Sequence, residues 1–192
     1  SLLFGCIWGL IQGIPLVVAR TGGILQNRAI YYFLNPIVNA LRSLPFIILL
    51  IAVIPLTKML VGTSIGTWAA IVPLTIYVGP YLGRLIETSL LEVNEGIVES
   101  AQAMGASPWQ IIFKFIIPEA RSSLILNLTT GTISLIGATA MAGAVGAGGI
   151  GDLAISYGYQ RFDTSVVILT VIVLLLLVQM VQMLGDWLAK LR

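Results

Sequence analysis

The stretch Val166-Val-Ile-Leu-Thr-Val-Ile-Val-Leu-Leu-Leu-Leu-Val178 is apolar at every position except Thr170. A membrane strand alternates polar and apolar residues, so this run cannot be such a strand. It lies inside the uncharged segment Thr164–Gly185, which is long enough for a helix to cross about 30 Å of hydrocarbon. The stretch therefore predicts a membrane-spanning helix and an all-α fold.

The same pattern recurs along the chain. Charged residues are absent from Ser1–Ala19, Met59–Gly83 and Ser122–Gly151, and a shorter uncharged stretch covers Ser43–Thr57. Charged residues make up 9% of the chain and hydrophobic residues 58%, whereas a soluble domain carries about 25% charged residues. Because a charge in the middle of a membrane is costly, this segregation predicts several spans in one integral membrane domain.

We place five transmembrane helices on the apolar stretches, in one domain that covers residues 1–192. Their expected ranges are Leu2–Ala19, Ile37–Thr57, Gly66–Glu87, Ser122–Gly143 and Thr164–Leu188. The fold class is therefore all-α and polytopic. Ser1 is followed at once by apolar residues without an initiator methionine, so we expect the first helix to begin before Ser1. The lack of a basic start and of a small-residue cleavage site argues against a signal peptide.

The basic residues predict the orientation. With five spans, one face of the membrane receives most of them and the other receives only Lys58 and Arg161. The first face holds Arg20, Arg28, Arg42, Arg84, Lys114, Arg121, Lys190 and Arg192. The positive-inside rule assigns this face to the cytoplasm. We therefore expect the N-terminus outside, the C-terminus in the cytoplasm, and the long polar loop Thr88–Arg121 in the cytoplasm.

The residue inventory excludes several kinds of chemistry. Histidine is absent and Cys6 is the single cysteine, which excludes His-dependent triads, His-ligated metals and an intrachain disulfide. The net charge of +2 is too small for the basic face that nucleic-acid binding requires. No carboxylate lies deep in a span, so an intramembrane enzyme is disfavoured. We expect no catalytic residue and no metal.

The segment Gly146-Ala-Gly148-Gly-Ile-Gly151 has the glycine spacing of a dinucleotide-binding loop, with Asp163 downstream. Such a loop functions between a strand and a helix of a soluble β-α-β unit, whereas this one follows a predicted span. The sequence also lacks a G-x-x-x-x-G-K-[ST] phosphate loop, so the chain cannot itself be the usual ATPase. We expect no cofactor bound by this chain.

The cytoplasmic loop, at about residues 92–120, predicts two short helices joined by a tight turn. Ile97–Met104 favours helix, and Gly105 suits the left-handed position that ends it. Ser107 then caps a second helix with Pro108 at its first position, and Ser107 and Gln110 have capping-box spacing. Pro118 ends or bends this second helix. The loop is expected to be rigid, which suits the transmission of force.

Within this loop, Glu99-Ser-Ala101, Gly105 and Pro118 resemble the EAA motif of bacterial ABC-importer permeases: Glu-Ala-Ala, three residues, Gly, nine residues, then Ile-x-Leu-Pro. The departures are Ser100 for Ala, Phe115 for Ile and Ile117 for Leu. In that family the loop is the coupling helix that docks into a cleft of the cytoplasmic ATPase. The resemblance implies coupling roles for Glu99, Ala101, Ala103, Met104, Gly105, Ala106 and Pro118.

The resemblance covers essentially the whole chain, and several stretches look like the methionine-uptake branch. These are Arg42–Leu50, Pro55–Thr57, Gly62–Gly66, Ala70–Thr75, Met141–Gly151 and Tyr157–Tyr159. The resemblance implies a multi-pass permease in the bacterial inner membrane and a homodimer with an alternating-access pathway. It also implies two cytoplasmic ATPase subunits that use ATP and Mg, and an external substrate-binding protein. A related permease for another amino acid, betaine or a sulfonate is the alternative.

Pathway residues are harder to assign. Arg42 is either a gate or solute contact, or an arginine near the cytoplasmic helix end that snorkels to the interface; the second interpretation is preferred. Residues 137–151 are rich in Gly and Ala, which fits either a substrate path or a packing seam. Ser134, Met141 and Gly143 are the other pathway candidates. Arg84 and Glu87, one turn apart, are expected to pair at the cytoplasmic boundary.

Two further considerations concern function. An ion-coupled secondary transporter or channel places ionisable groups in the middle of the membrane, and these spans are almost free of them, which disfavours that class. Five helices also leave little room for an enclosed water-filled path, whereas two copies related by a two-fold axis provide ten helices and an interface for one. A dimer is therefore expected on physical grounds as well.

Overall fold

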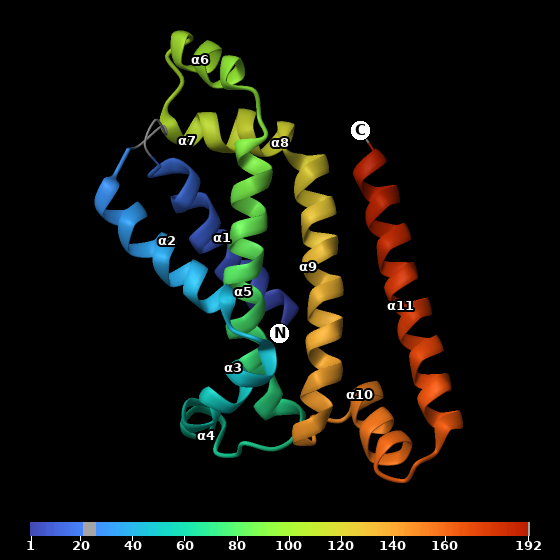
Figure 1. Cartoon of the computed structure of the whole chain (residues 1–192). Helices are drawn as coiled ribbons and strands as arrows, with labels where there is room; N and C mark the ends of the chain where they lie inside the picture. The colour runs from blue at the N-terminus through green and yellow to red at the C-terminus, as the bar shows by residue number, and fades with distance from the viewer. Residues whose placement is uncertain (21–25, 192) are drawn as a thin grey trace.

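The computed structural model describes residues 1–20 and 26–191. These residues form helices and connecting turns, with no strand in the described ranges, which confirms the all-α prediction. Three long helices run side by side along the molecule: α5 (Thr67–Leu91), α9 (Arg121–Ala142) and α11 (Thr164–Lys190). The C-terminal end of α11 lies at the same end of the molecule as the hairpin that joins α5 to α9 (Figure 1).

Helices α5, α9 and α11 are each long and apolar enough to cross a membrane. A fourth crossing is formed if α2 (Arg28–Ser43) and α3 (Phe46–Ala52) count together as one broken span. Helix α1 (Leu2–Val18) is apolar but has 17 residues. Helices occupy each of the five predicted ranges, although the second range is broken, and the number of crossings stays a prediction.

The single helix predicted over Ile37–Thr57 is wrong. Helix α2 ends at Ser43, and the chain turns by 107° into α3, which is followed by α4 (Ile54–Val61). Pro45 cannot donate a backbone hydrogen bond, and it disfavours helical geometry at Leu44, whose φ and ψ are −79° and 127°. The helix therefore breaks at Leu44–Pro45, inside the predicted span.

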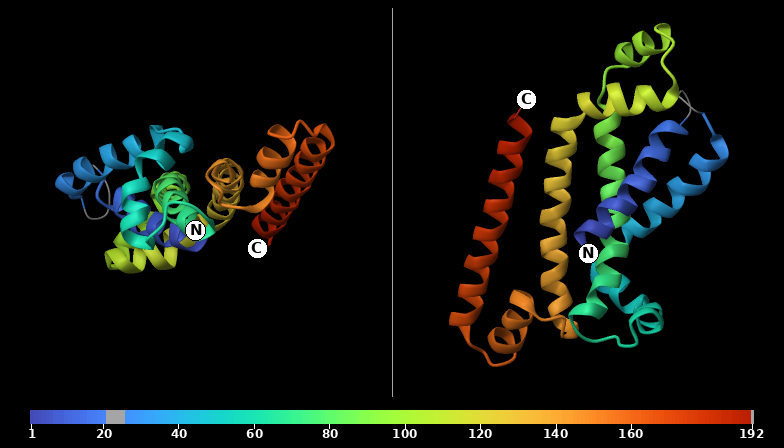
Figure 2. Two further views of the ribbon diagram at one scale, coloured as in Figure 1. Left: turned by 90° about the horizontal axis from the view of Figure 1, so that it is seen from below. Right: turned by 180° about the vertical axis from the view of Figure 1, so that it is seen from behind.

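Helix α1 packs along α5 through small residues. A Cβ atom on Gly9 would lie 3.0 Å from the backbone nitrogen of Gly83, and one on Gly13 would lie 2.7 Å from the carbonyl oxygen of Gly83. The two backbones can approach this closely only because the side chains are absent. The pair forms one flank of the bundle, with α9 and α11 on the other side (Figure 2).

The glycine-rich segment after α9 forms a compact turn instead of a nucleotide loop. It contains a 3-10 turn η2 (Gly143–Val145), helix α10 (Gly149–Leu153) and a π-helix η3 (Ala154–Tyr159). A Cβ on Gly151 would overlap the backbone of Ala140, and one on Gly143 would overlap the backbone of Asp152. Thr67 Oγ1 donates to the Ala147 carbonyl across 2.9 Å and fastens this turn to the start of α5.

Two apolar clusters stabilise the bundle. The first lies between α3, α5 and α9 and is centred on Val78, Leu82 and Leu135. The second lies where α5 meets the hairpin and includes Ile86, Leu90, Ala101, Ile111, Ile116 and Ala120. Helix α11 contacts α9 and the α10–η3 segment, and only 6% of the residues in its most apolar stretch are buried. Its remaining surface is therefore left for lipid or another chain.

Candidate functional site

The hairpin between α5 and α9 begins with helix α6 (Glu95–Ala103). Asn94 caps it, since its side-chain oxygen accepts from the Gly96 backbone N–H at 2.8 Å. This cap satisfies one of the free N–H groups of the first turn. The helix predicted around Ile97–Met104 is confirmed, with its start at Glu95. The cap itself was missed, although an Asn directly before Glu-Gly is a recognisable signal.

Gly105 ends α6 in the predicted left-handed conformation. Its φ is +76°, and no atom lies within 4 Å of the position that a Cβ would occupy. The Ala106 N–H then donates to the Ala101 carbonyl across 3.1 Å, which closes the end of the helix. Backbone conformation therefore favours glycine here, whereas the space around it is free.

The second helix begins with the predicted capping box. The Gln110 N–H donates to Ser107 Oγ at 3.4 Å, and the Ser107 N–H donates to Gln110 Oε1 at 2.8 Å. Helix α7 (Pro108–Gln110) continues into a π-helix η1 (Ile111–Ile116) and α8 (Ile117–Glu119). These helices run across the end of α5, roughly perpendicular to it (Figure 1).

The π-helical segment was not predicted. The Ile117 N–H donates to the carbonyl of Ile112, five residues back. Pro118 follows directly, has no N–H, and cannot bond to the carbonyl of Lys114 in the α-helical pattern. The wider turn thus coincides with the missing donor. As predicted, the second helix ends near Pro118: α8 ends at Glu119, and α9 begins at Arg121.

Ala101 fixes the hairpin to the bundle. It is fully buried at 0% exposure and belongs to the cluster with Ile86, Ile111 and Ile116. A larger side chain at this position would separate α6 from η1, since buried positions tolerate little added volume. The buried Ala101 therefore packs α6 against the second helix of the hairpin and against the end of α5.

The other candidate coupling residues lie at the tip and on the outer surface. Glu99, Ala103 and Pro118 are exposed, Ala106 is half-buried, and Met104 is 69% exposed. Trp109 and Phe113 stack on the outer side of the second helix, with ring centroids 6.0 Å apart. The hairpin thus offers an apolar, flexible side chain at the far end of a rigid support.

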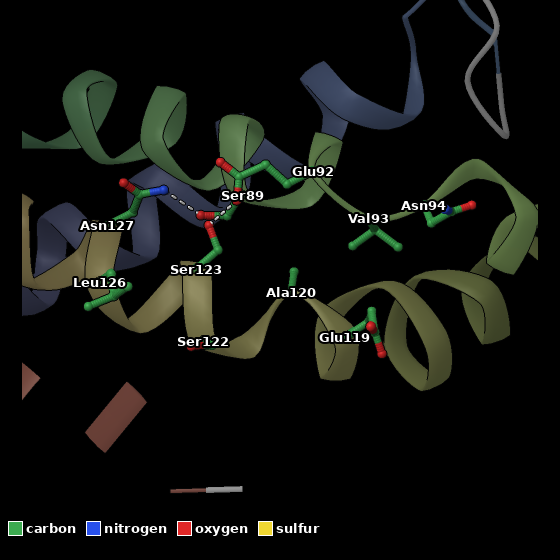
Figure 3. Close-up of a pocket in the computed structure, with 10 residues that line it drawn as sticks. All are labelled: Ser89, Glu92, Val93, Asn94, Glu119, Ala120, Ser122, Ser123, Leu126 and Asn127. Carbon is green, nitrogen blue, oxygen red and sulfur yellow. Dashed lines mark hydrogen bonds between the residues drawn. The ribbon is translucent and has the colours of Figure 1, made fainter. Parts of the chain in front are cut away.

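A cavity of about 670 Å³ lies below the hairpin, between the end of α5 and the start of α9. Figure 3 shows its lining residues, which include Glu92 and Glu119. Asn127 Nδ2 donates to Ser89 Oγ across 2.7 Å, and Ser123 Oγ donates to the Glu92 carboxylate. These bonds join α5 to α9 directly beneath the hairpin. Sequence reasoning did not find this cavity, because its residues come from separate helices.

The predicted Arg84–Glu87 pair is confirmed. Arg84 Nη1 lies 2.6 Å from Glu87 Oε2, and the same nitrogen donates to Asn35 Oδ1 on α2 at 3.2 Å. Glu87 is buried at 3% exposure. Arg84 therefore compensates the buried carboxylate of Glu87 and also connects α5 to α2.

Arg42 does not lie where the preferred interpretation placed it. Helix α2 begins at Arg28, so Arg42 is in its last turn, about 21 Å along the helix at 1.5 Å per residue. Its guanidinium carbon is 5.8 Å from the centroid of the Tyr81 ring. Arg42 thus lies beside the middle of α5 and not near the helix end at the hairpin.

The remaining pathway candidates have different surroundings. Ser134 Oγ is 3.2 Å from the Tyr77 hydroxyl on α5, whereas Met141 is 53% exposed. Gly143 is buried against the α10 backbone, as expected for a packing residue. Arg42 and Ser134 therefore lie around one pair of tyrosines, away from Gly143. Sequence reasoning missed Tyr77 and Tyr81, although aromatic residues four apart on one helix were a usable signal.

Comparison with known proteins agrees with this architecture. Residues 7–191 match the family described as "Binding-protein-dependent transport system inner membrane component". The probable D-methionine transport system permease protein MetI of Vibrio cholerae is 47% identical over 186 residues, covering 97% of this chain and 83% of that protein. The methionine import system permease protein MetP of Bacillus subtilis is 42% identical over 171 residues, covering 89% and 77% respectively.

The solved structures agree. A chain of the MetNI methionine ABC transporter in an inward-facing conformation superposes with a TM-score of 0.96 at 44% identity, covering 98% of this chain and 88% of that one. The fold is that of a polytopic helical membrane subunit with a capped hairpin between two of its long helices. The chain belongs to the binding-protein-dependent transport system inner membrane component family. It is a multi-pass transport component of the inner membrane and not an enzyme.

Proposed function

We propose that this chain is the membrane permease of an ATP-driven importer of methionine. The assignment is supported by relatives that carry methionine-transport names at 42–47% identity and by the likeness to the methionine transporter structure. Two copies of the chain form the solute pathway at their interface. An external binding protein delivers methionine, and two cytoplasmic ATPase subunits bind ATP and Mg.

The observation that carries the coupling role is the construction of the α6–α8 hairpin. Ala101 is fully buried, Gly105 closes the turn, and Met104 is displayed at the tip. A rigid element of this kind transmits displacement to α5, whereas a flexible loop would absorb it. Glu99, Ala103, Ala106 and Pro118 complete the surface that faces the ATPase.

In this mechanism ATP binding brings the ATPase subunits together, and the two hairpins follow. The helices move as rigid bodies about the dimer interface, and the pathway opens outward to receive methionine. Hydrolysis reverses the movement and releases methionine into the cytoplasm. Energy enters through the partner, in accord with the absence of a phosphate loop in this sequence.

The orientation follows from the same assignment. The hairpin lies in the cytoplasm, together with Lys114, Arg121 and the C-terminal end of α11. The α10–η3 segment, which lies at the opposite end of the molecule (Figure 1), then faces outward, and the N-terminal end of α1 is directed toward the same side from the middle of the bundle. Cysteine residues introduced at Glu99 and Tyr159 should react with impermeant reagents from opposite sides of the membrane.

The function is tested by ATP-dependent uptake of labelled methionine into proteoliposomes that contain this chain, its genomically paired ATPase and its binding protein. We expect accumulation that unlabelled methionine blocks and that glutamine, betaine and taurine do not. ATP-driven uptake of another solute would retain the permease and refute the substrate. A stable complex that moves no solute with ATP would refute the coupling role.

A further inference from the structure

Arg42 is a charged residue at a position where charges are rare, beside the middle of a membrane-spanning helix. The Tyr81 ring beneath it is about 15 Å along α5 from Leu91, at a rise of 1.5 Å per residue. This distance is close to half of the 25-residue helix. The α2–α3 junction lies beside the middle of α5 in both side views (Figures 1 and 2). The arginine is thus at mid-membrane depth, where a charge is expensive unless it meets water or a partner.

The described part of the chain gives Arg42 no acidic partner. The ion pair found in those residues joins Arg84 to Glu87. Arg42 is exposed, and its guanidinium lies over the face of the Tyr81 ring. A cation–π contact holds the guanidinium without using its N–H donors. Those donors remain available for an anion.

The surroundings of Arg42 are polar along α2. Asn35, Asn39 and Arg42 lie on one side of that helix at helical spacing, and Asn39 Nδ2 donates to Asn35 Oδ1 across 3.2 Å. Asn35 in turn accepts from Arg84. Contact of these amides and this guanidinium with lipid would be energetically costly. Polar side chains in spans face the bundle interior or a water-filled path, and we expect the same of this row.

The aromatic contacts continue from Arg42 to α9. The Tyr81 and Tyr77 rings are stacked with centroids 6.4 Å apart and an interplanar angle of 5°. Phe46 packs edge-on against Tyr77 at 5.3 Å, and the Tyr77 hydroxyl lies 3.2 Å from Ser134 Oγ. Separate elements therefore position one continuous row of polar and aromatic groups.

We propose that Arg42, Tyr81, Tyr77 and Ser134 form half of a mid-membrane site for the carboxylate of an amino-acid solute, completed by the same row from a second copy. The inference rests on the proposed function for its solute. Arginine presents its N–H donors in a plane that matches a carboxylate. Tyr81 orients the guanidinium, and the Tyr77–Ser134 pair offers hydroxyl groups to the rest of the solute.

Accessibility tests the location without any solute. In a Cys6→Ser background, Arg42→Cys is introduced into the complex in proteoliposomes and treated with a charged, membrane-impermeant thiosulfonate. We expect the thiol of the Arg42→Cys variant to be modified at least tenfold faster than that of Leu175→Cys, which lies at similar depth on the apolar surface of α11. Equal, slow labelling of both variants would overturn the proposal.

Transport tests the role. Arg42→Met should lower methionine uptake at least tenfold while ATP hydrolysis stimulated by the binding protein persists, and Arg42→Lys should recover part of the uptake. Tyr81→Leu should lower uptake further than Tyr81→Phe, because the ring and not the hydroxyl holds the guanidinium. Arg28→Met, at the other end of α2, is the matched control.

The two tests separate the site from the assigned substrate. Normal uptake by Arg42→Met would overturn the carboxylate site, whatever the labelling result. If the wild-type complex accumulates no methionine, the proposed function fails. Fast labelling of the Arg42→Cys variant would then still support an aqueous mid-membrane site, and slow labelling would overturn that site as well.

Discussion

Arg84 and Glu87 form an ion pair on α5 in which Nη1 lies 2.6 Å from Oε2. The Glu87 side chain is 4% exposed, whereas that of Arg84 is 30% exposed. The carboxylate therefore depends on its partner for compensation, while the guanidinium retains some access to the surroundings. This asymmetry predicts that, in a double-mutant cycle, single substitutions of Arg84 and of Glu87 will change the free energy of unfolding by different amounts.

We expect Arg84→Met to lower the free energy of unfolding by about 3 kcal/mol, because it leaves a buried carboxylate unpaired. Arg84→Met with Glu87→Leu should recover most of this loss, since an apolar pair needs no compensation. Denaturation of the purified chain in detergent measures both. Arg28→Met, at the exposed start of α2, controls for the loss of charge; an equal effect there would contradict the interpretation.

Gly151 and Gly137 provide a matched pair of substitutions. A Cβ on Gly151 would overlap the Ala140 backbone, whereas nothing lies within 4 Å of one on Gly137. Gly151→Ala should therefore destabilise the α9–α10 contact by about 1–3 kcal/mol, and Gly137→Ala should be neutral. Thermal unfolding of the two variants in detergent checks this. Equal melting temperatures would show that the α10 turn shifts without cost.

At Gly105 the expected cost is conformational. Its φ of +76° is unfavourable for a branched side chain, by about 1–2 kcal/mol, whereas Asn tolerates the left-handed region. We expect Gly105→Val to fold but to hydrolyse ATP with strongly reduced uptake, and Gly105→Asn to remain coupled. The ratio of transported solute to hydrolysed ATP is the measurement. Full coupling in the Val variant would refute a rigid hairpin.

Met104 should contribute directly to binding the ATPase. Burying a side chain that is 69% exposed in the free chain is worth about 2 kcal/mol, so Met104→Ala should weaken the complex at least tenfold. Met59, 78% exposed at the far end of the molecule, is the matched control. Affinity is measured by titrating ATPase subunits onto the immobilised permease. Equal losses from both alanine variants would place the contact elsewhere.

Local rules predicted the hairpin well. The left-handed Gly105, the Ser107–Gln110 box and the end near Pro118 each depend on residues within one or two turns, so their sequence signals are self-contained. The same rules failed at Leu44–Pro45. Hydropathy measures the length of an apolar run and does not indicate whether a proline inside it bends the chain or is accommodated.

The depth of Arg42 shows the consequence. A helix that begins at Ile37 places Arg42 near the membrane boundary, whereas α2 begins at Arg28. An error in one boundary moved a charge from the interface to the middle of the bundle. Boundaries are the least reliable part of a sequence assignment because no periodic signal marks them.

The amino-acid sequence is sufficient to predict a helical, membrane-embedded chain with a capped hairpin between two of its spans. Apolar length and capping are properties of neighbouring residues, so they can be read without knowing the fold. The contacts of Arg42 with Tyr81, of Tyr77 with Ser134 and of Gly151 with Ala140 are seen in the folded chain and not in the sequence. These contacts depend on how helices pack and rotate against one another, which no single segment encodes.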